Sequence, residues 1–176
     1  MSDAEPIQID IRPEKPEDAL EIRALVASAF GPGKVTPDFV EAVRAQAEVC
    51  LAEAAIHAGV IVGHAQWCDA PFVVDDRRVE AAYLSCLSVI PSLHGRGIGS
   101  RLVWGGLARL SEAGYVAASL LGAPAYYGRF GFSSDLAEPI EAPHRSRGRG
   151  FQAIELVPGA LAGTTIRGDF PPVIAP

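Results

Sequence analysis

The 176 residues are enough for one domain with a substantial core and too few for two domains of ordinary size. Hydrophobic residues make up 49% of the chain and charged residues 20%, a balance typical of a folded protein and not of a disordered one. The formal net charge of −6 opposes attraction to DNA or RNA, which depends on a cationic surface. We therefore expect a single domain over residues 1–176 and no nucleic-acid partner.

The sequence also limits the compartment. No stretch is long and apolar enough to span a bilayer, and the acidic residues 1–6 lack the basic and then apolar regions of a secretion signal. We expect a cytoplasmic protein with no membrane partner. The three cysteines, Cys50, Cys68 and Cys86, are widely separated and lack the close pairs that zinc sites and redox motifs need, so we expect them to be reduced and buried, and we expect no metal.

The chain begins with a predicted strand and helix. Residues 7–12 alternate between apolar and polar side chains, and Pro13 ends the pattern, as in a half-buried strand. Pro16 and two acidic residues are typical of a helix start. The helix is expected to end at Gly31, and its apolar residues recur at helical spacing: Leu20, Ile22, Leu25, Val26, Ala29 and Phe30.

A short helix and a hairpin are expected next. Thr36 and Pro37 are typical of a helix cap and first turn, and one face of that helix carries Phe39, Val40, Val43 and Ala47. Residues 49–56 and 60–74 predict two strands joined by a turn. Pro71 lies inside the second of these segments, and a strand tolerates a proline only near a sheet edge or a bulge.

A glycine-rich segment in the middle of the chain organises the rest. An apolar strand near residues 80–89 stops at Pro91, and a helix is expected from about 97 to 113. Between them, glycines 95, 97 and 99 would let a ligand approach the backbone, and a helix start presents unpaired N–H groups with a partial positive charge. The segment predicts a phosphate-binding loop in preference to a plain flexible turn.

Two other phosphate-binding motifs do not fit this segment. A nicotinamide-dinucleotide fingerprint needs a third glycine, where this chain has Ser100 or Leu102, and a nucleoside-triphosphate loop needs Gly-Lys-Ser/Thr, which is absent. Within the helix, Gly105 and Gly106 each cost about 1 kcal/mol relative to alanine, so we expect a close approach to the sheet there. Gly114 is placed to end the helix.

The last third predicts three further strands and a short helix. Strands are expected at residues 115–121, from Phe132 and at 151–157, and Gly122 to Pro124 opens the short helix that carries Tyr126 and Tyr127. The tail is rich in glycine and proline and predicts a loop with one short extended piece. The basic stretch 144–150 could touch a phosphate or an acidic acceptor, but such runs are usually solvated loops.

Two segments carry a family resemblance. The run from Val89 to Gly99 resembles the acyl-CoA motif of the GNAT superfamily of N-acetyltransferases, Gln/Arg-x-x-Gly-x-Gly/Ala, with Gly97 and Gly99 on its small positions and His94 in place of Gln or Arg. Residues 126–132 resemble the family's Tyr-x-x-x-Gly-Phe segment, and residues 121–127 are similar to predicted bacterial acetyltransferases within the superfamily.

The resemblance implies a fold. It is a mixed α/β fold with a mostly antiparallel central sheet of about seven strands, splayed between the fourth and fifth strands and flanked by about four helices. The acyl-CoA-binding core would span about residues 80–132, with the pantetheine arm lying between the splayed strands. The acyl-CoA contacts it implies are Leu87, Ser88, Val89, His94, Gly95, Arg96, Gly97, Ile98, Gly99 and Ser100.

The resemblance also implies a chemistry. Tyr127 matches the position of the family's general acid. A phenol with a pKa of about 10 is protonated at neutral pH and can donate a proton to a departing thiolate. We interpret Tyr126 as a packing residue. Many relatives have a glutamate base on the fourth strand where this chain has Tyr83. The base therefore stays open, with four unplaced candidates: Glu53, His64, Glu80 and Glu155. A Cys86–His94 nucleophile is conceivable, but a cysteine in an apolar strand is usually inert core.

We accordingly predict an acetyl-CoA-dependent N-acetyltransferase in which an amine attacks the thioester directly. Backbone N–H groups near residues 87–89 would stabilise the oxyanion, as the family implies. The alternative is a non-catalytic acyl-CoA-binding or regulatory module. The acceptor would be an amine of a small molecule or a protein, and the protein a monomer or homodimer.

Overall fold

The structure is a computed structural model that describes residues 7–31 and 35–174, with the backbone alone for 144–147. The acidic start, Pro32–Gly33, and the side chains of the basic stretch at 144–147 lie outside this description. The elements in chain order are β1 (Asp10–Pro13), η1 (Pro16–Asp18), α1 (Ala19–Phe30), α2 (Pro37–Gln46), β2 (Val49–His57), β3 (Val60–Asp69), β4 (Phe72–Val74), β5 (Arg77–Val79), β6 (Ala81–Val89), η2 (Pro91–Leu93), α3 (Ile98–Glu112), β7 (Ala117–Leu121), α4 (Pro124–Tyr127), η3 (Gly128–Phe130), α5 (Ser134–Ala137), β8 (Ile140–Glu141), η4 (Pro143–Gly150), β9 (Phe151–Glu155) and β10 (Ile166–Gly168).

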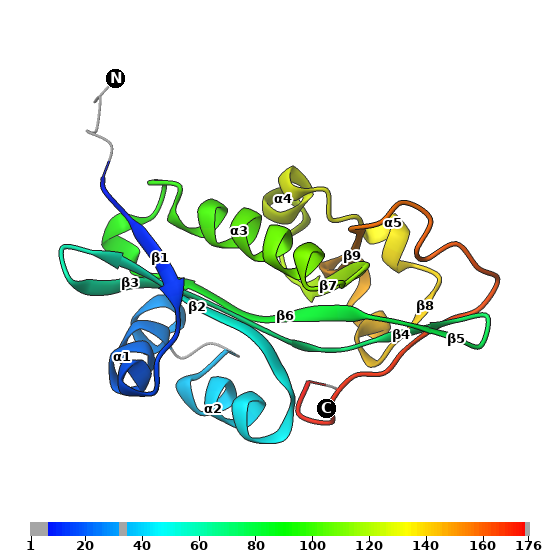
Figure 1. Cartoon of the computed structure of the whole chain (residues 1–176), viewed down its shortest axis with the longest axis horizontal. Helices are drawn as coiled ribbons and strands as arrows, with labels where there is room; N and C mark the ends of the chain where they lie inside the picture. The colour runs from blue at the N-terminus through cyan, green and yellow to red at the C-terminus, as the bar shows by residue number, and fades with distance from the viewer. Residues whose placement is uncertain (1–6, 32–34, 175–176) are drawn as a thin grey trace.

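A six-stranded mixed sheet lies between two layers of helices. Its order is β1-β2-β3-β6-β7-β9, and all neighbours are antiparallel except β6 and β7. Figure 1 shows α3 and α4 over one face and α1 and α2 over the other. The mixed α/β class is confirmed, with six strands in the main sheet where about seven were expected.

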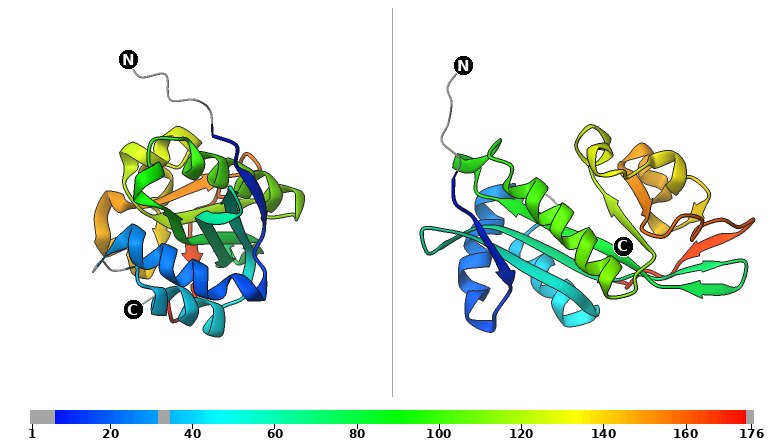
Figure 2. Two further views of the ribbon diagram at one scale, coloured as in Figure 1. Left: turned by 90° about the vertical axis from the view of Figure 1, so that its left-hand side faces the viewer. Right: turned by 45° about the horizontal axis from the view of Figure 1, so that its top comes forward.

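The two strands at the middle of this sheet separate along their length. Pairing between β6 and β7 joins Ala81–Leu84 to Ala117–Leu120, and no strand pairs with residues 85–89 on that side within the described chain. The right-hand view of Figure 2 shows the two halves of the sheet diverging. The predicted splay is thus confirmed, and it leaves backbone N–H and C=O groups of β6 available along the open edge.

Helix boundaries follow the local chemistry that the sequence indicated. The Thr36 side chain accepts a hydrogen bond from the Phe39 N–H at 3.1 Å, with Pro37 in the first turn of α2. Gly114 follows α3 in a left-handed conformation with φ 92°. In α1, Ile22, Leu25 and Val26 are buried, but Leu20 is 81% exposed, so its expected place on the apolar face is wrong.

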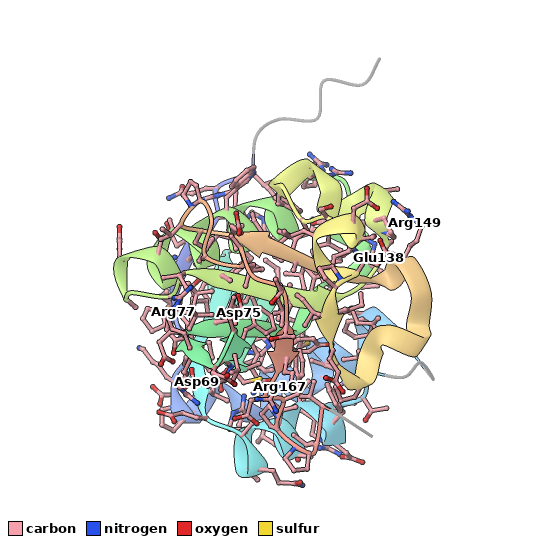
Figure 3. The ribbon with its side chains drawn as sticks, turned by 90° about the vertical axis from the view of Figure 1, so that its right-hand side faces the viewer. Asp69, Asp75, Arg77, Glu138, Arg149 and Arg167 are labelled. Carbon is pink, nitrogen blue, oxygen red and sulfur yellow. The ribbon has the colours of Figure 1, made fainter. Side chains whose placement is uncertain are left out.

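The predicted strand over residues 60–74 is divided in two. β3 ends at Asp69, and Phe72–Val74 is instead a strand of a second sheet of order β5-β4-β10-β8. The β4–β5 hairpin of this sheet was not predicted from the sequence. Asp75 and Asp76 make the hairpin turn with positive φ, and the Asp75 carboxylate accepts hydrogen bonds from the Thr164 and Thr165 N–H groups. Figure 3 shows Asp75, Arg77 and Arg167 at this end of the molecule. The extended piece expected in the tail is β10.

Two further expectations are corrected or refined. No strand starts at Phe132, whose ring is buried in the core beneath α3; Ser133 caps α5 and makes only an isolated bridge to Ala153. Gly106 packs against the sheet as expected, because a Cβ there would lie 2.8 Å from Trp67 Nε1. Gly105 does not, since a Cβ there would meet only the guanidinium of Arg109.

No helix among the described residues is both long and apolar enough to cross a membrane.

Candidate active site

A cavity of about 480 Å³ lies where the open edge of β6 meets the start of α3. It contains nine of the eleven residues to which the sequence analysis gave a role, together with Leu93, Tyr126 and Arg129. The nine are Leu87, Val89, His94, Gly95, Gly97, Ile98, Gly99, Ser100 and Tyr127. One wall is therefore strand and glycine loop, and the other is the short α4–η3 segment.

The glycine loop has the geometry of an anion site. Gly95 and Gly97 have φ values of 77° and 80°, a region in which side chains other than glycine are strained. No atom lies within 4 Å of a Cβ built on either residue, so the backbone there is open to a ligand. Gly97 caps the 15-residue helix α3 without a side-chain hydrogen bond, and its first turn carries no acidic residue. The N–H groups of this turn can therefore bind a phosphate.

Gly99 is small for another reason. A Cβ built on it would lie 2.6 Å from the Tyr126 hydroxyl, which occupies the place of a side chain. The rings of Tyr126 and Tyr127 are almost perpendicular, with centroids 4.9 Å apart, which is an edge-to-face aromatic contact. The interpretation of Tyr126 as a packing residue alone is therefore incomplete, since it also lines the cavity.

His94 closes the loop against the strand. Its Nε2 atom lies 2.8 Å from the Val89 carbonyl oxygen, which makes Nε2 the donor in this contact. The side chain thus ties the two ends of the turn that contains Pro91. A Cys86–His94 pair is wrong, because Cys86 is buried among α1 side chains and burial raises the pKa of its thiol to about 12.

Tyr127 lines the cavity beside Tyr126. Its ring packs against Phe130 and Phe132 and fills the space beside Gly122, where a Cβ would clash with it. Burial raises the pKa of Tyr127 above its ordinary value of 10.0, with smaller contributions from Tyr126 and Cys86. The phenol is therefore a proton donor throughout the neutral range.

Two of the residues implied as acyl-CoA contacts do not line the cavity. The Ser88 side chain is buried on the opposite face of β6, beside Cys86, which leaves only its backbone toward the splay. Arg96 is exposed on the loop but is not among the lining residues.

The four candidate bases lie elsewhere. Glu53 is fully buried, with an oxygen 2.8 Å from Arg109 Nη1. Glu80 pairs with Arg78, and Glu155 accepts hydrogen bonds from the backbone of Gly159 and Leu161. None of these carboxylates lines the cavity.

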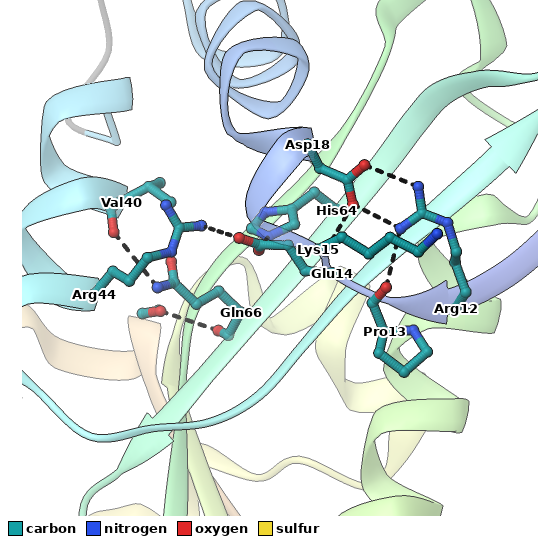
Figure 4. Close-up of polar contacts among 10 residues, drawn as sticks. Arg12, Pro13, Glu14, Lys15, Asp18, Val40, Arg44, His64 and Gln66 are labelled. Atoms are coloured by element: carbon teal, nitrogen blue, oxygen red, sulfur yellow. Dashed lines mark hydrogen bonds and ion pairs between the residues drawn. The ribbon is translucent and has the colours of Figure 1, made fainter.

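His64 belongs to a polar cluster on the α1–α2 face, which Figure 4 shows in close-up. His64 Nε2 lies 2.7 Å from Glu14 Oε2, and Glu14 Oε1 accepts from Arg44 Nη2 at 2.6 Å. Burial opposes ionisation of Glu14, but the hydrogen bonds and charges of His64 and Arg44 keep the net pKa of its carboxyl lowered. Glu14 and Arg44 could not be predicted from the sequence as partners of His64, because they lie 50 and 20 residues from it along the chain and no local pattern joins them.

Among the described residues, no group of three or more His, Cys, Asp or Glu side chains is arranged to hold a metal ion.

Known proteins are similar to this chain over most of its length. Residues 10–134 match the family model of the acetyltransferase (GNAT) domain. The chain is 30% identical over 156 residues to the uncharacterized N-acetyltransferase YhbS of Escherichia coli, covering 88% of this chain and 92% of that protein. It is also 33% identical over 117 residues to the uncharacterized N-acetyltransferase YjhQ of the same organism, covering 65% of this chain and 64% of that protein.

Solved structures give the same result in three dimensions. The crystal structure of YhbS from Escherichia coli in complex with CoA aligns with a TM-score of 0.81 and 28% identity, covering 95% of this chain and 93% of that one. A GNAT-family acetyltransferase from Brucella melitensis in complex with acetyl-CoA aligns with a TM-score of 0.69 and 32% identity, covering 86% and 90%. Because the family model matches most of this chain, the chain belongs to the GNAT family of acetyltransferases.

Proposed function

We propose that the cavity between β6, the glycine loop and α4 binds acetyl-CoA and that the protein transfers its acetyl group to a primary amine. As a GNAT-family member, the chain is an acetyl-CoA-dependent N-acetyltransferase. The observation that carries the proposal is the convergence of an open anion-binding loop, an unpaired strand edge and a protonated phenol on one cavity. A module that only bound acyl-CoA would not need the phenol.

Two parts of the cavity would bind two different parts of acetyl-CoA. The diphosphate would lie on the N–H groups from Gly95 to Ser100, where no side chain intervenes at Gly95 or Gly97. The pantetheine arm, an amide chain, would pair with the backbone of residues 87–89 along the open edge of β6. This assigns Ser88 a backbone role, in keeping with the direction of its side chain.

Tyr127 supplies the proton in this account. Acetyl transfer forms a C–N bond and breaks the C–S bond, so the departing sulfur becomes a thiolate unless it is protonated. A half-buried phenol with a raised pKa is held in the donor form, which suits it to this step. Backbone N–H groups near residues 87–89 would stabilise the negative charge that develops on the thioester oxygen.

The remaining proposals concern the whole protein. Residues 1–176 would form one catalytic domain with its acyl-CoA core at about 80–132, and the protein would be a monomer or a homodimer. The three free cysteines support a reducing, cytoplasmic location. The acceptor would be an amine of a small molecule or a protein.

Two experiments test the proposal. A library of small amines and of peptides with lysine or free amino termini, incubated with acetyl-CoA and a thiol-detecting reagent, should identify an acceptor that releases CoA. Calorimetry should show acetyl-CoA binding that Gly97→Val weakens at least tenfold, because valine is strained at φ 80° and would cover the loop N–H groups. Release of no CoA with any amine, together with unchanged binding in a folded Gly97→Val variant, would overturn the proposal.

A further inference from the structure

One cation on the cavity wall opposite the glycine loop has no role in the proposed chemistry. Arg129 is an exposed residue of η3 that lines the cavity together with Gly97, Gly99 and Ser100. Apart from His94, it is the only basic side chain among the lining residues in the described part of the chain. A permanent positive charge at this place calls for an explanation in terms of a ligand.

The guanidinium of Arg129 is held in a fixed direction by Tyr126. Its Nε donates a hydrogen bond to the Tyr126 carbonyl oxygen at 2.9 Å. Its Cζ atom lies 4.7 Å from the centroid of the Tyr126 ring, in the range of a cation–π contact. Both contacts use the inner edge and the face of the group, so the two terminal nitrogens keep their N–H donors for another partner.

No carboxylate of the described residues supplies that partner. Arg12, Arg23, Arg44, Arg78, Arg109 and Arg149 each lie within 4.0 Å of an acidic oxygen, whereas no acidic oxygen of the described chain lies so close to Arg129. Within the described chain no such oxygen lies near Arg77, Arg101 or Arg167 either, but of these arginines only Arg129 lines the cavity. A planar guanidinium with two free NH₂ groups matches the oxygens of a phosphate group bidentately.

The cavity thus has two places for anions, one on each wall. The first is the start of α3, and the second is Arg129 on its Tyr126 platform. A CoA thioester carries two separate phosphate groups, the diphosphate and the ribose 3′-phosphate. If the diphosphate lies on the glycine loop, as proposed above, the 3′-phosphate is the group left for the arginine.

We propose that Arg129, oriented by Tyr126, binds the 3′-phosphate of the acyl-CoA and so selects CoA thioesters over their 3′-dephospho analogues. This inference rests on the proposed acetyl-CoA binding. It adds a specificity-determining residue, which the family motifs did not mark, and gives Tyr126 a second role beside its contact with Gly99.

The test compares two ligands across matched variants. Calorimetric Kd values are measured for acetyl-CoA and for acetyl-3′-dephospho-CoA with the wild-type protein, Arg129→Met and Arg129→Lys. Methionine keeps the length of the side chain without its charge, and lysine keeps the charge without the planar fork. Arg77→Met, on β5 and outside the cavity lining, makes the same change in net charge and is the control.

The expected result is ligand-specific. Arg129→Met should weaken acetyl-CoA binding roughly 10- to 100-fold, the scale of charge-assisted hydrogen bonds, and leave the Kd of the dephospho analogue unchanged. Arg129→Lys should lose part of that affinity, and Arg77→Met should lose none for either ligand. Because Arg129 is an exposed residue, loss of folding is not expected, and a melting curve checks it.

The other outcomes separate the two proposals. An equal loss for both ligands would place Arg129 on the diphosphate and overturn its selection of the 3′-phosphate. No loss for either ligand would overturn the site altogether, while the proposed function would stand. A wild-type protein that bound neither ligand would overturn the proposed function, and the phosphate site with it.

Discussion

The hydroxyl of Tyr126 occupies the position that a side chain on Gly99 would take. The two residues come from opposite walls of the cavity, and a Cβ on Gly99 would lie 2.6 Å from the Tyr126 oxygen. Gly99 must therefore lack a side chain because the Tyr126 hydroxyl fills that space. Gly97 has open space around it, and glycine is required there by the positive φ and by the approach of the ligand.

This relationship predicts an interaction between two substitutions. Gly99→Ala should displace the Tyr126 ring and weaken acetyl-CoA binding roughly tenfold, although alanine itself favours the helix by about 1 kcal/mol. Tyr126→Phe removes the clashing oxygen, so the double variant should bind more tightly than Gly99→Ala alone. Calorimetry on all four proteins measures the coupling. Strictly additive losses would show that the hydroxyl and the Cβ do not compete for one space.

The adjacent glycines of α3 should respond differently to alanine. Gly105→Ala should change stability by less than about 1 kcal/mol, because the gain in helix propensity is opposed by displacement of Arg109 Nη1, which lies 2.8 Å from the buried Glu53 carboxylate. Gly106→Ala should destabilise it by about 1–3 kcal/mol, since the Cβ would press on the buried indole of Trp67. Urea unfolding of the two variants gives both values, and a loss of stability in Gly105→Ala as large as that in Gly106→Ala would contradict the packing described for this helix.

His94 should be replaceable by glutamine. Glutamine can donate from its side-chain amide to the Val89 carbonyl oxygen, as His94 Nε2 does now, so acetyl-CoA affinity should change less than threefold. His94→Ala, which cannot donate, is the matched comparison and should loosen the turn and weaken binding more. A hundredfold loss of affinity in His94→Gln would show that the imidazole itself contacts the cosubstrate.

The Arg12–Asp18 pair should make stability depend on pH in the acid range. Hydrogen bonding from Arg12 lowers the pKa of Asp18 from 3.8 to about 2. A carboxyl with a lowered pKa in the folded state stabilises the protein fully above pH 3.8, and this contribution is lost as the pH falls toward 2. Asp18→Asn should therefore unfold more easily at pH 7 and show a shallower loss of stability on acidification. A wild-type slope retained in the variant would exclude Asp18 as a contributor.

Much of this architecture could be predicted from local sequence, and the reasons are physical. The cap at Thr36, the terminator Gly114 and the strand–loop–helix unit around residues 80–113 are set by neighbours in the chain. The β4–β5 hairpin was missed because its strands have three residues each and its turn uses Asp75 and Asp76 instead of glycine. Strands this short carry too little alternation to predict.

The residues of the site could be predicted where a local motif marks them. They could not be predicted where their role depends on side chains that are brought together only by the fold. The glycines and Tyr127 lie in motifs, and all of these residues line the cavity. Tyr126 and Arg129 carry no local sign of their roles, because the first depends on contact with Gly99 across the cavity and the second on facing the glycine loop from the other wall.

The most direct measurement is the turnover of Tyr127→Phe with acetyl-CoA and a confirmed amine acceptor. Phenylalanine keeps the ring that packs on Phe130 and Phe132 and removes only the donor, so kcat should fall by roughly 10²- to 10⁴-fold while the Kd of acetyl-CoA stays nearly unchanged. The deficit should shrink with an acyl donor whose thiol has a much lower pKa, because its thiolate leaves without a proton. Wild-type turnover in Tyr127→Phe with acetyl-CoA would contradict the account and leave Tyr127 as a packing residue.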